Sequence, residues 1–157
     1  MYKMDSEFLK RKEQLKHDME KRRYLRKITE MLNNMSGMHL LEICEVNISE
    51  KLKNTEYFSC DKIPESKINC RSDKKDICQW IINCMDFHNG DIVNLIFNDI
   101  CAKVKLIDVE KSVFEFWEKN RSITVLSQNV LKEICEDSRD EYNYLFDKYS
   151  VRCDVNG

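Results

Sequence analysis

The spacing of apolar residues predicts a long helix at the start of the chain. No proline interrupts the stretch from about Asp5 to Ser36, and Gly37 stands where the residue after a helix end is expected. The second half of this stretch carries a narrow apolar seam, formed by Leu25, Ile28, Leu32 and Met35. The first half is more polar, and the pattern leaves open whether it packs on the rest of the chain or projects.

A second organised region begins near Ser72. Ser72 or Asp73 is expected to cap a helix that runs to about Phe87 and ends at the Asn89-Gly90 pair. Two runs rich in β-branched residues follow, with Asn98-Asp99 between them, and predict a hairpin over 91–107. In the second run Ala102, Val104 and Leu106 alternate with Lys103, Lys105 and Ile107, so the face that carries the lysines is expected to be more exposed to solvent.

Three further elements complete the expected domain. Asp108 should cap a helix that ends at Asn120, and RSITVLS should form a strand. The apolar spacing over 128–136 predicts a short helix, and EYNYLFDKY predicts a final strand. The segment HLLEICEVNI fits either a helical turn or a strand, and DKIPESKINCRSD is typical of a loop.

The element order predicts the fold class. We expect an α+β domain over 38–157, with a mostly antiparallel four-stranded sheet packed with helices, preceded by the long N-terminal helix over 1–37. The connection between Leu106 and Ser122 is long enough for a crossover, which would make one strand pair parallel. A single globular unit suits the 157-residue length.

Composition narrows the class of protein. Hydrophobic residues make up 42% and charged residues 34% of the chain, which is typical of a folded soluble protein. The N-terminus has no apolar secretory segment, and no apolar run is long enough to span a bilayer, so we expect a cytoplasmic protein that does not engage a membrane. Its eight cysteines are accordingly expected to be reduced thiols.

Catalytic and metal chemistry receive little support from the sequence. The best zinc arrangement would combine Cys60 and Cys70 with Cys84 and His88, yet the chain has no C-x-x-C pair. There are three histidines, and no nucleophile elbow, zinc-protease motif or phosphate-binding loop accompanies them. We therefore expect a protein that is not an enzyme and that uses neither a cofactor nor a metal.

Charge is distributed unevenly along the chain. Residues 1–30 contain ten basic and six acidic side chains, whereas residues 133–147 contain one basic and six acidic side chains. The basic helix offers one hypothesis, contact with nucleic acid by a small phage or mobile-element regulator, although Glu13, Asp18 and Glu20 intersperse its basic residues. Its apolar seam offers another, the pairing of two long helices, so the sequence does not decide between a monomer and a homodimer.

The acidic C-terminal region supports a different use. Acids alternate there with tyrosines, which give rigid contact area, and the acids supply complementarity to a basic partner. Nuclease inhibitors often present such a surface because it imitates the anionic substrate. The alternative is a strand edge whose charges merely prevent pairing with another chain.

The order of elements from about Gln79 to Tyr149 adds a resemblance. The CQWIINCMDF helix, the hairpin, the VFEFWEK helix, the SITVLS strand and the closing DEYNYLF segment together resemble small cytosolic immunity proteins of bacterial polymorphic-toxin systems, of the type that accompanies LXG toxins. The long basic N-terminal helix departs from that pattern. The resemblance implies a protein that binds a cognate toxin domain and has no activity of its own.

Taken together, the sequence predicts a non-catalytic inhibitor that binds and neutralises a bacterial toxin or nuclease domain. The residues predicted to bind the partner belong to the acidic, tyrosine-bearing region and the preceding helix: Glu136, Asp137, Asp140, Glu141, Tyr142, Tyr144, Trp117 and Glu118.

Overall fold

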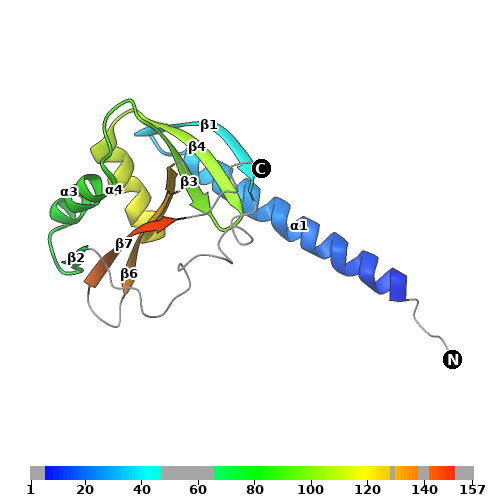
Figure 1. Ribbon diagram of the computed structural model, residues 1–157. Coiled ribbons are helices and arrows are strands. Elements are labelled where there is room, and N and C mark those ends of the chain that lie inside the picture. Colours follow the sequence, from blue (N-terminus) through cyan, green and yellow to red (C-terminus); the bar gives the residue numbers. More distant parts are fainter. Residues whose placement is uncertain (1–5, 47–65, 128–129, 138–141, 151–157) are drawn as a thin grey trace. The chain divides into compact units, whose positions relative to one another are not determined.

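The computed structural model describes residues 6–46, 66–127, 130–137 and 142–150. The chain divides into two compact units, Met1–Asn34 and Met35–Gly157. The first contains one helix, α1 (Ser6–Asn33), in which Ile28 and Leu32 are buried. This confirms the long N-terminal helix, which ends slightly earlier than the sequence predicts (Figure 1).

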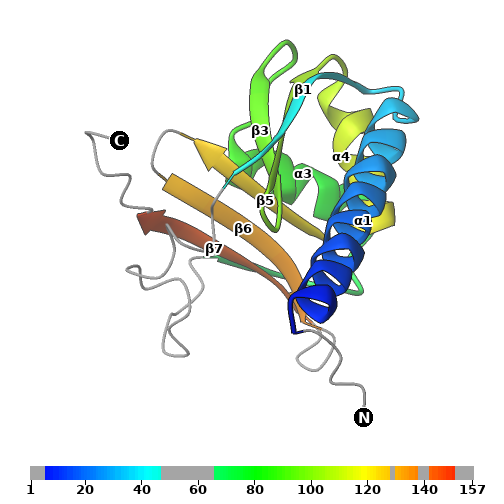
Figure 2. The same cartoon turned by 90° about the vertical axis from the view of Figure 1, so that its right-hand side faces the viewer.

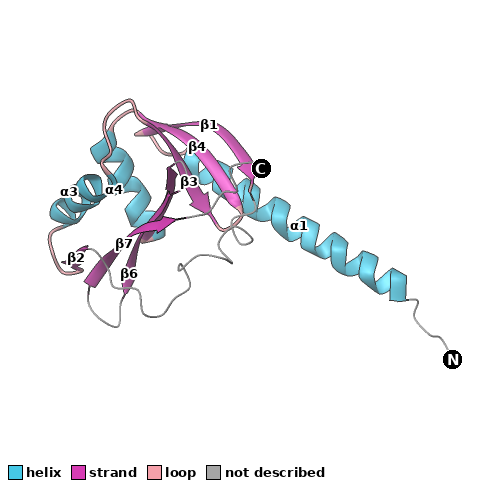
Figure 3. Ribbon diagram, viewed as in Figure 1, coloured by secondary structure: helices cyan, strands magenta, loops and turns pink. Residues whose placement is uncertain are grey.

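The second unit is an α+β domain, as the sequence predicts (Figure 3). Its strands are β1 (Met38–Glu45), β2 (Ser66–Asn69), β3 (Ile92–Phe97), β4 (Ile100–Leu106), β5 (Ser122–Ser127), β6 (Val130–Asp137) and β7 (Tyr142–Ser150), and its helices are α3 (Lys74–Met85) and α4 (Val109–Asn120). The described strands form one seven-stranded sheet in the order β1-β4-β3-β5-β6-β7-β2. The expected count of four strands is therefore too low.

Every strand pair in this sheet is antiparallel, which corrects the expected parallel pair. The crossover from β4 through α4 to β5 does exist. It passes over β3, so β5 pairs with β3 and not with β4. Helices α3 and α4 lie on one face of the sheet (Figures 1 and 2).

The β3–β4 hairpin and α4 agree with the sequence. Phe97 pairs with Ile100, and Asn98 adopts the left-handed conformation that a tight turn favours. Ala102, Val104 and Leu106 are buried, whereas Lys103 and Lys105 are exposed, as strand alternation predicts. The buried residues of α4 include Val109, Val113, Phe116 and Trp117, which recur at helical spacing.

The predicted helix over 128–136 is wrong, because this segment contains strand β6. Leu131 and Ile134 are 1% and 0% exposed. They stand three residues apart, so they belong to opposite faces of a strand. A strand buried on both faces loses the polar alternation that identifies an exposed strand, and its apolar positions then resemble helical spacing.

Strands β1 and β2 occupy a region whose pattern is weak. HLLEICEVNI proves to be a strand, since its residues fall largely in β1, and part of the predicted loop pairs with β7 as β2. Helix α3 begins after Asp73, as expected, but ends at Met85 with Asp86 in the left-handed conformation, earlier than the Asn89-Gly90 pair.

Candidate functional site

Four of the eight predicted partner-binding residues lie at one end of the sheet, where β6 ends and β7 begins. In the strand register Asp137 pairs with Tyr142, Glu136 with Asn143, and Cys135 with Tyr144. Glu136 is exposed. We call this region, comprising Glu136, Asp137, Tyr142 and Tyr144, the β6–β7 end. Asp140 and Glu141 lie outside the described residues.

The last turn of α4 reaches the same place. Arg121, which follows α4, accepts a hydrogen bond on its carbonyl oxygen from the backbone N–H of Glu136, with 3.3 Å between nitrogen and oxygen. Arg121 adopts a left-handed conformation, which turns the chain directly from α4 into β5. This hydrogen bond places the residue that follows α4 beside the end of β6.

The two α4 residues predicted to bind a partner have different environments. Glu118 is exposed and forms an ion pair with Lys74 of α3, with 3.0 Å between Oε1 and Nζ. The hydrogen bond from Lys74 lowers the pKa of Glu118. Trp117 is only 3% exposed, so its side chain offers a partner almost no surface. Its indole N–H has no hydrogen-bond acceptor among the described residues.

Strand β7 is not an edge strand where the tyrosines lie. Tyr142 to Leu145 pair with β6 on one side and with β2 on the other, since Ser66 pairs with Leu145 and Asn69 with Tyr142. Tyr142 and Tyr144 at the start of β7 therefore do not lie on an open sheet edge.

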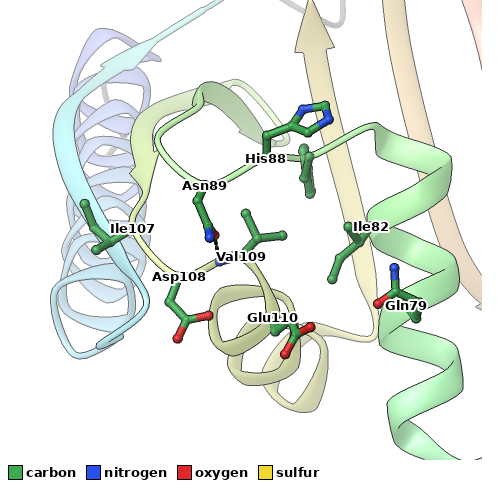
Figure 4. Close-up of a pocket in the computed structure, with 9 residues that line it drawn as sticks. Gln79, Ile82, His88, Asn89, Ile107, Asp108, Val109 and Glu110 are labelled. Carbon is green, nitrogen blue, oxygen red and sulfur yellow. Dashed lines mark hydrogen bonds between the residues drawn. The ribbon is translucent and has the colours of Figure 1, made fainter.

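A groove between α3 and α4 is a second candidate, which the sequence did not indicate. It has a volume of about 460 Å³ and is lined by Gln79 and Ile82 of α3, by the segment 87–89, and by residues 107–110 at the start of α4 (Figure 4). The amide oxygen of Asn89 accepts a hydrogen bond from the Val109 N–H across 2.9 Å. Asn89 and Val109 are 20 residues apart, so no local sequence pattern predicts the hydrogen bond between them.

His88, beside this groove, lies between two carboxylates. Its Nδ1 is 3.3 Å from Asp91, and its Nε2 is 3.4 Å from Asp86. All three side chains are exposed, so water competes with these contacts and weakens them. Asp91 also accepts a hydrogen bond from the His88 backbone N–H, and the cluster thus serves to hold the turn between α3 and β3.

The cysteines and histidine considered as the best zinc arrangement are not brought together among the described residues. His88 lies beyond the end of α3, so Cys84 and His88 do not share a helical turn. Cys60 is outside the described residues, and within them no three His, Cys, Asp or Glu side chains are grouped to hold a metal ion. The six described cysteines form no disulfide, and burial raises the pKa of Cys78 and of Cys101. Raised values keep these two thiols protonated and weakly nucleophilic.

Comparison with known proteins gives no family for the chain: no family model, curated protein sequence or solved structure matches it. No helix among the described residues has the length and apolar character needed to cross a membrane.

Proposed function

We propose that this protein is a non-catalytic inhibitor, an immunity protein that binds and neutralises a bacterial toxin or nuclease domain through the β6–β7 end. The observation that carries the proposal is the double pairing of β7 over Tyr142 to Leu145. The competing explanation is that this composition protects an open sheet edge. Glu136 and Asp137 lie on β6, between β5 and β7, and β2 covers β7 from Tyr142 to Leu145, so no open edge needs protection at these residues.

The position of Glu136 and of the end of α4 supports the same proposal. Glu136 is exposed, and the hydrogen bond between its N–H and Arg121 brings Glu118 of α4 to the same end of the domain. Glu118 is already paired with Lys74, so complementarity to a basic partner rests chiefly on Glu136. Such complementarity acts chiefly on the rate of association, because it steers the encounter over distances longer than a contact.

Replacing Glu136 and Asp137 together with lysine tests the proposal. The partner to test is the product of a toxin or nuclease gene found beside the gene for this protein, with association followed by stopped-flow or surface-based kinetics. We expect the association rate to fall by at least about tenfold at low salt, with little change in thermal unfolding. The broader variant Asp137→Lys, Asp140→Lys, Glu141→Lys should slow association further.

The matched control replaces Glu42 and Glu45 with lysine. Both are exposed residues of β1, at the opposite edge of the sheet, and the change in net charge is the same. If the two double variants slow association equally, the effect is one of net charge and the β6–β7 end is not the docking surface. An unchanged rate in the Glu136 and Asp137 variant leads to the same conclusion.

A further inference from the structure

The helix α1 carries an exposed apolar line that its burial pattern does not explain. Phe8, Leu15 and Met19 are 60%, 64% and 52% exposed. At about 100° per residue, Leu15 and Met19 fall within about 20° of Phe8 around the helix axis. The buried residues Ile28 and Leu32 fall about 160° and 120° away from that line. The exposed line is thus a separate face of the helix.

Basic residues flank this line on both sides. Arg11 and Arg22 lie about 40–60° to one side, and Lys12 and Arg23 lie about 40–60° to the other. Arg26 lies on the line itself. All five are exposed, and none of them forms an ion pair with another described residue. We call these five residues, with Phe8, Leu15 and Met19, the basic face.

The acidic residues of α1 lie mostly elsewhere on the helix. Glu13 and Glu20 fall about 120–140° from Phe8, and Glu7 about 100° from it. Among the acidic residues from Ser6 to Thr29, Asp18 lies nearest to the exposed line, about 80° from Phe8 around the helix axis. Its carboxylate accepts a hydrogen bond from Gln14, a residue that lies about 120° from Phe8. The acids that intersperse the basic residues along the sequence are thus separated from the basic face in the helix. This separation removes the main objection to a phosphate-binding surface.

We propose that the basic face of α1 binds duplex DNA, with the helix lying in the major groove. The major groove is about 12 Å wide, admits one α-helix, and has a row of phosphates along each side. A helix in it needs positive charge on both flanks and contacts base edges, including thymine methyl groups, along its centre. The two basic rows and the apolar line between them have this arrangement. The proposal goes beyond the inhibitor function and does not rest on it.

Two other occupants fit the basic face less well. If a second copy of α1 packed on this face, the five positive side chains of one helix would face the same five of the other. From Ser6 to Thr29 the face has no acidic residue that would offset their repulsion. Duplex RNA has a deep and narrow major groove, which the side chains of an α-helix cannot enter. The proposal therefore predicts a preference for duplex DNA over duplex RNA.

Fluorescence anisotropy of the full chain with a labelled DNA duplex of about 20 base pairs tests the proposal, at salt concentrations from about 50 to 200 mM. The variant Arg11→Gln, Arg22→Gln, Arg23→Gln should bind at least about tenfold more weakly at the lowest salt. The slope of log affinity against log salt should become shallower by about 2–3, since each phosphate contact contributes about 0.9. Leu15→Gln should weaken binding several-fold and leave that slope unchanged.

The matched control is Lys10→Gln, Lys21→Gln, Lys27→Gln, which removes the same charge from residues about 100–160° away from Phe8. Glutamine keeps helix propensity in both variants, and circular dichroism verifies it. Equal losses in the two triple variants would overturn the proposal, as would absence of binding at about 50 mM salt or equal binding of duplex RNA. Binding to phosphatidylserine vesicles in place of DNA would assign the basic face to a lipid surface and would overturn it too.

Discussion

The two ends of α4 differ in how their polar groups are satisfied. At the N-terminal end, hydrogen bonds join three separate segments of the chain: Gly37, Asn89 and the first turn of α4 with the residues just before it. At the C-terminal end, Asn120 Nδ2 donates to the Phe116 carbonyl oxygen and the Arg121 N–H donates to the Trp117 carbonyl oxygen. The indole N–H of Trp117 has no acceptor among the described residues, and the ion pair between Lys74 and Glu118 is exposed. The N-terminal end is therefore held by hydrogen bonds between distant segments of the chain, whereas the C-terminal end is capped mainly by groups of α4 itself and of Arg121.

Gly37 is central to the N-terminal end. Its carbonyl oxygen accepts hydrogen bonds from the backbone N–H groups of Ile107 and Asp108, each at 2.9 Å. The buried hydroxyl of Ser112 lies within hydrogen-bond distance of the carbonyl oxygens of Gly37 and of Asp108. The single hydroxyl proton can be donated to one of them at a time. The segment before β1 is therefore fastened directly to the start of α4.

The largest effect should come from Gly37→Ala. A Cβ atom on residue 37 would lie 2.6 Å from the backbone nitrogen of Ser112 and 3.0 Å from the carbonyl oxygen of Asp108. Backbone atoms cannot move aside as a flexible side chain can, so we expect a loss of about 3 kcal/mol in the free energy of unfolding, measured by urea denaturation.

The double variant Gly37→Ala, Ser112→Gly serves as its control. It removes the Ser112 hydroxyl, which would lie 2.8 Å from the new Cβ, but leaves the closer backbone nitrogen in place. We expect no recovery of stability. Recovery would mean that only the side chain opposes the alanine, and the N-terminal end would then be less rigid than its hydrogen bonds indicate.

Loss of a cap at the same end should have the next largest effect. Asp108 accepts a hydrogen bond from the Lys111 N–H, and Asn89 accepts one from the Val109 N–H. Asp108→Ala and Asn89→Ala should each lower the free energy of unfolding by about 1 kcal/mol, since each leaves a helix N–H without its acceptor. Glu110→Ala, a change at an exposed residue in the same turn, should have a much smaller effect, and equal effects would contradict the assigned roles.

The same contrast shows what the sequence could predict. The cap at Asp108 and the alternation along β4 are local patterns, and both were read correctly from spacing. Gly37 was predicted to follow the helix end, yet α1 ends at Asn33 and the glycine is required by the close approach of Ser112, 75 residues away. Strand β6 was missed because Leu131 and Ile134 are buried on opposite faces.

The candidate site was predictable only in part. The acidic and aromatic residues of the β6–β7 end are adjacent in the sequence, so their composition was visible directly. The pairing of β2 with β7 and the bond between Glu136 and Arg121 depend on tertiary structure, as does the burial of Trp117. Neither strand propensity nor helical spacing carries this information.

At the C-terminal end of α4, a substitution should stabilise the protein. Arg121 has φ 53° and ψ 18°, a left-handed conformation that costs a residue with a Cβ about 1–2 kcal/mol. Arg121→Gly removes that cost but increases the entropy of the unfolded chain, so we expect a net gain of about 0.5 kcal/mol in the free energy of unfolding. Arg121→Ala retains the Cβ and should give no gain. A loss of stability in the glycine variant would show that the Arg121 side chain stabilises this end.

The smallest effect concerns Glu115, between the two ends of α4, and depends on pH. The Ser36 hydroxyl donates to Glu115 Oε1 across 2.7 Å, and this hydrogen bond is the main cause that lowers the pKa of Glu115 below its ordinary value of 4.5. The folded state therefore binds this proton less tightly than the unfolded state does. The stability gained is present above about pH 4.5 and is lost as the pH falls through the lower folded value. Because the pair is exposed, we expect it to contribute only a few tenths of a kcal/mol to the free energy of unfolding.

The variant Glu115→Gln tests this expectation. It should lower the free energy of unfolding by that amount at neutral pH and should lessen the fall in stability on acidification, relative to Glu110→Gln. An acid transition of the same steepness in both variants would show that the hydrogen bond does not form in solution.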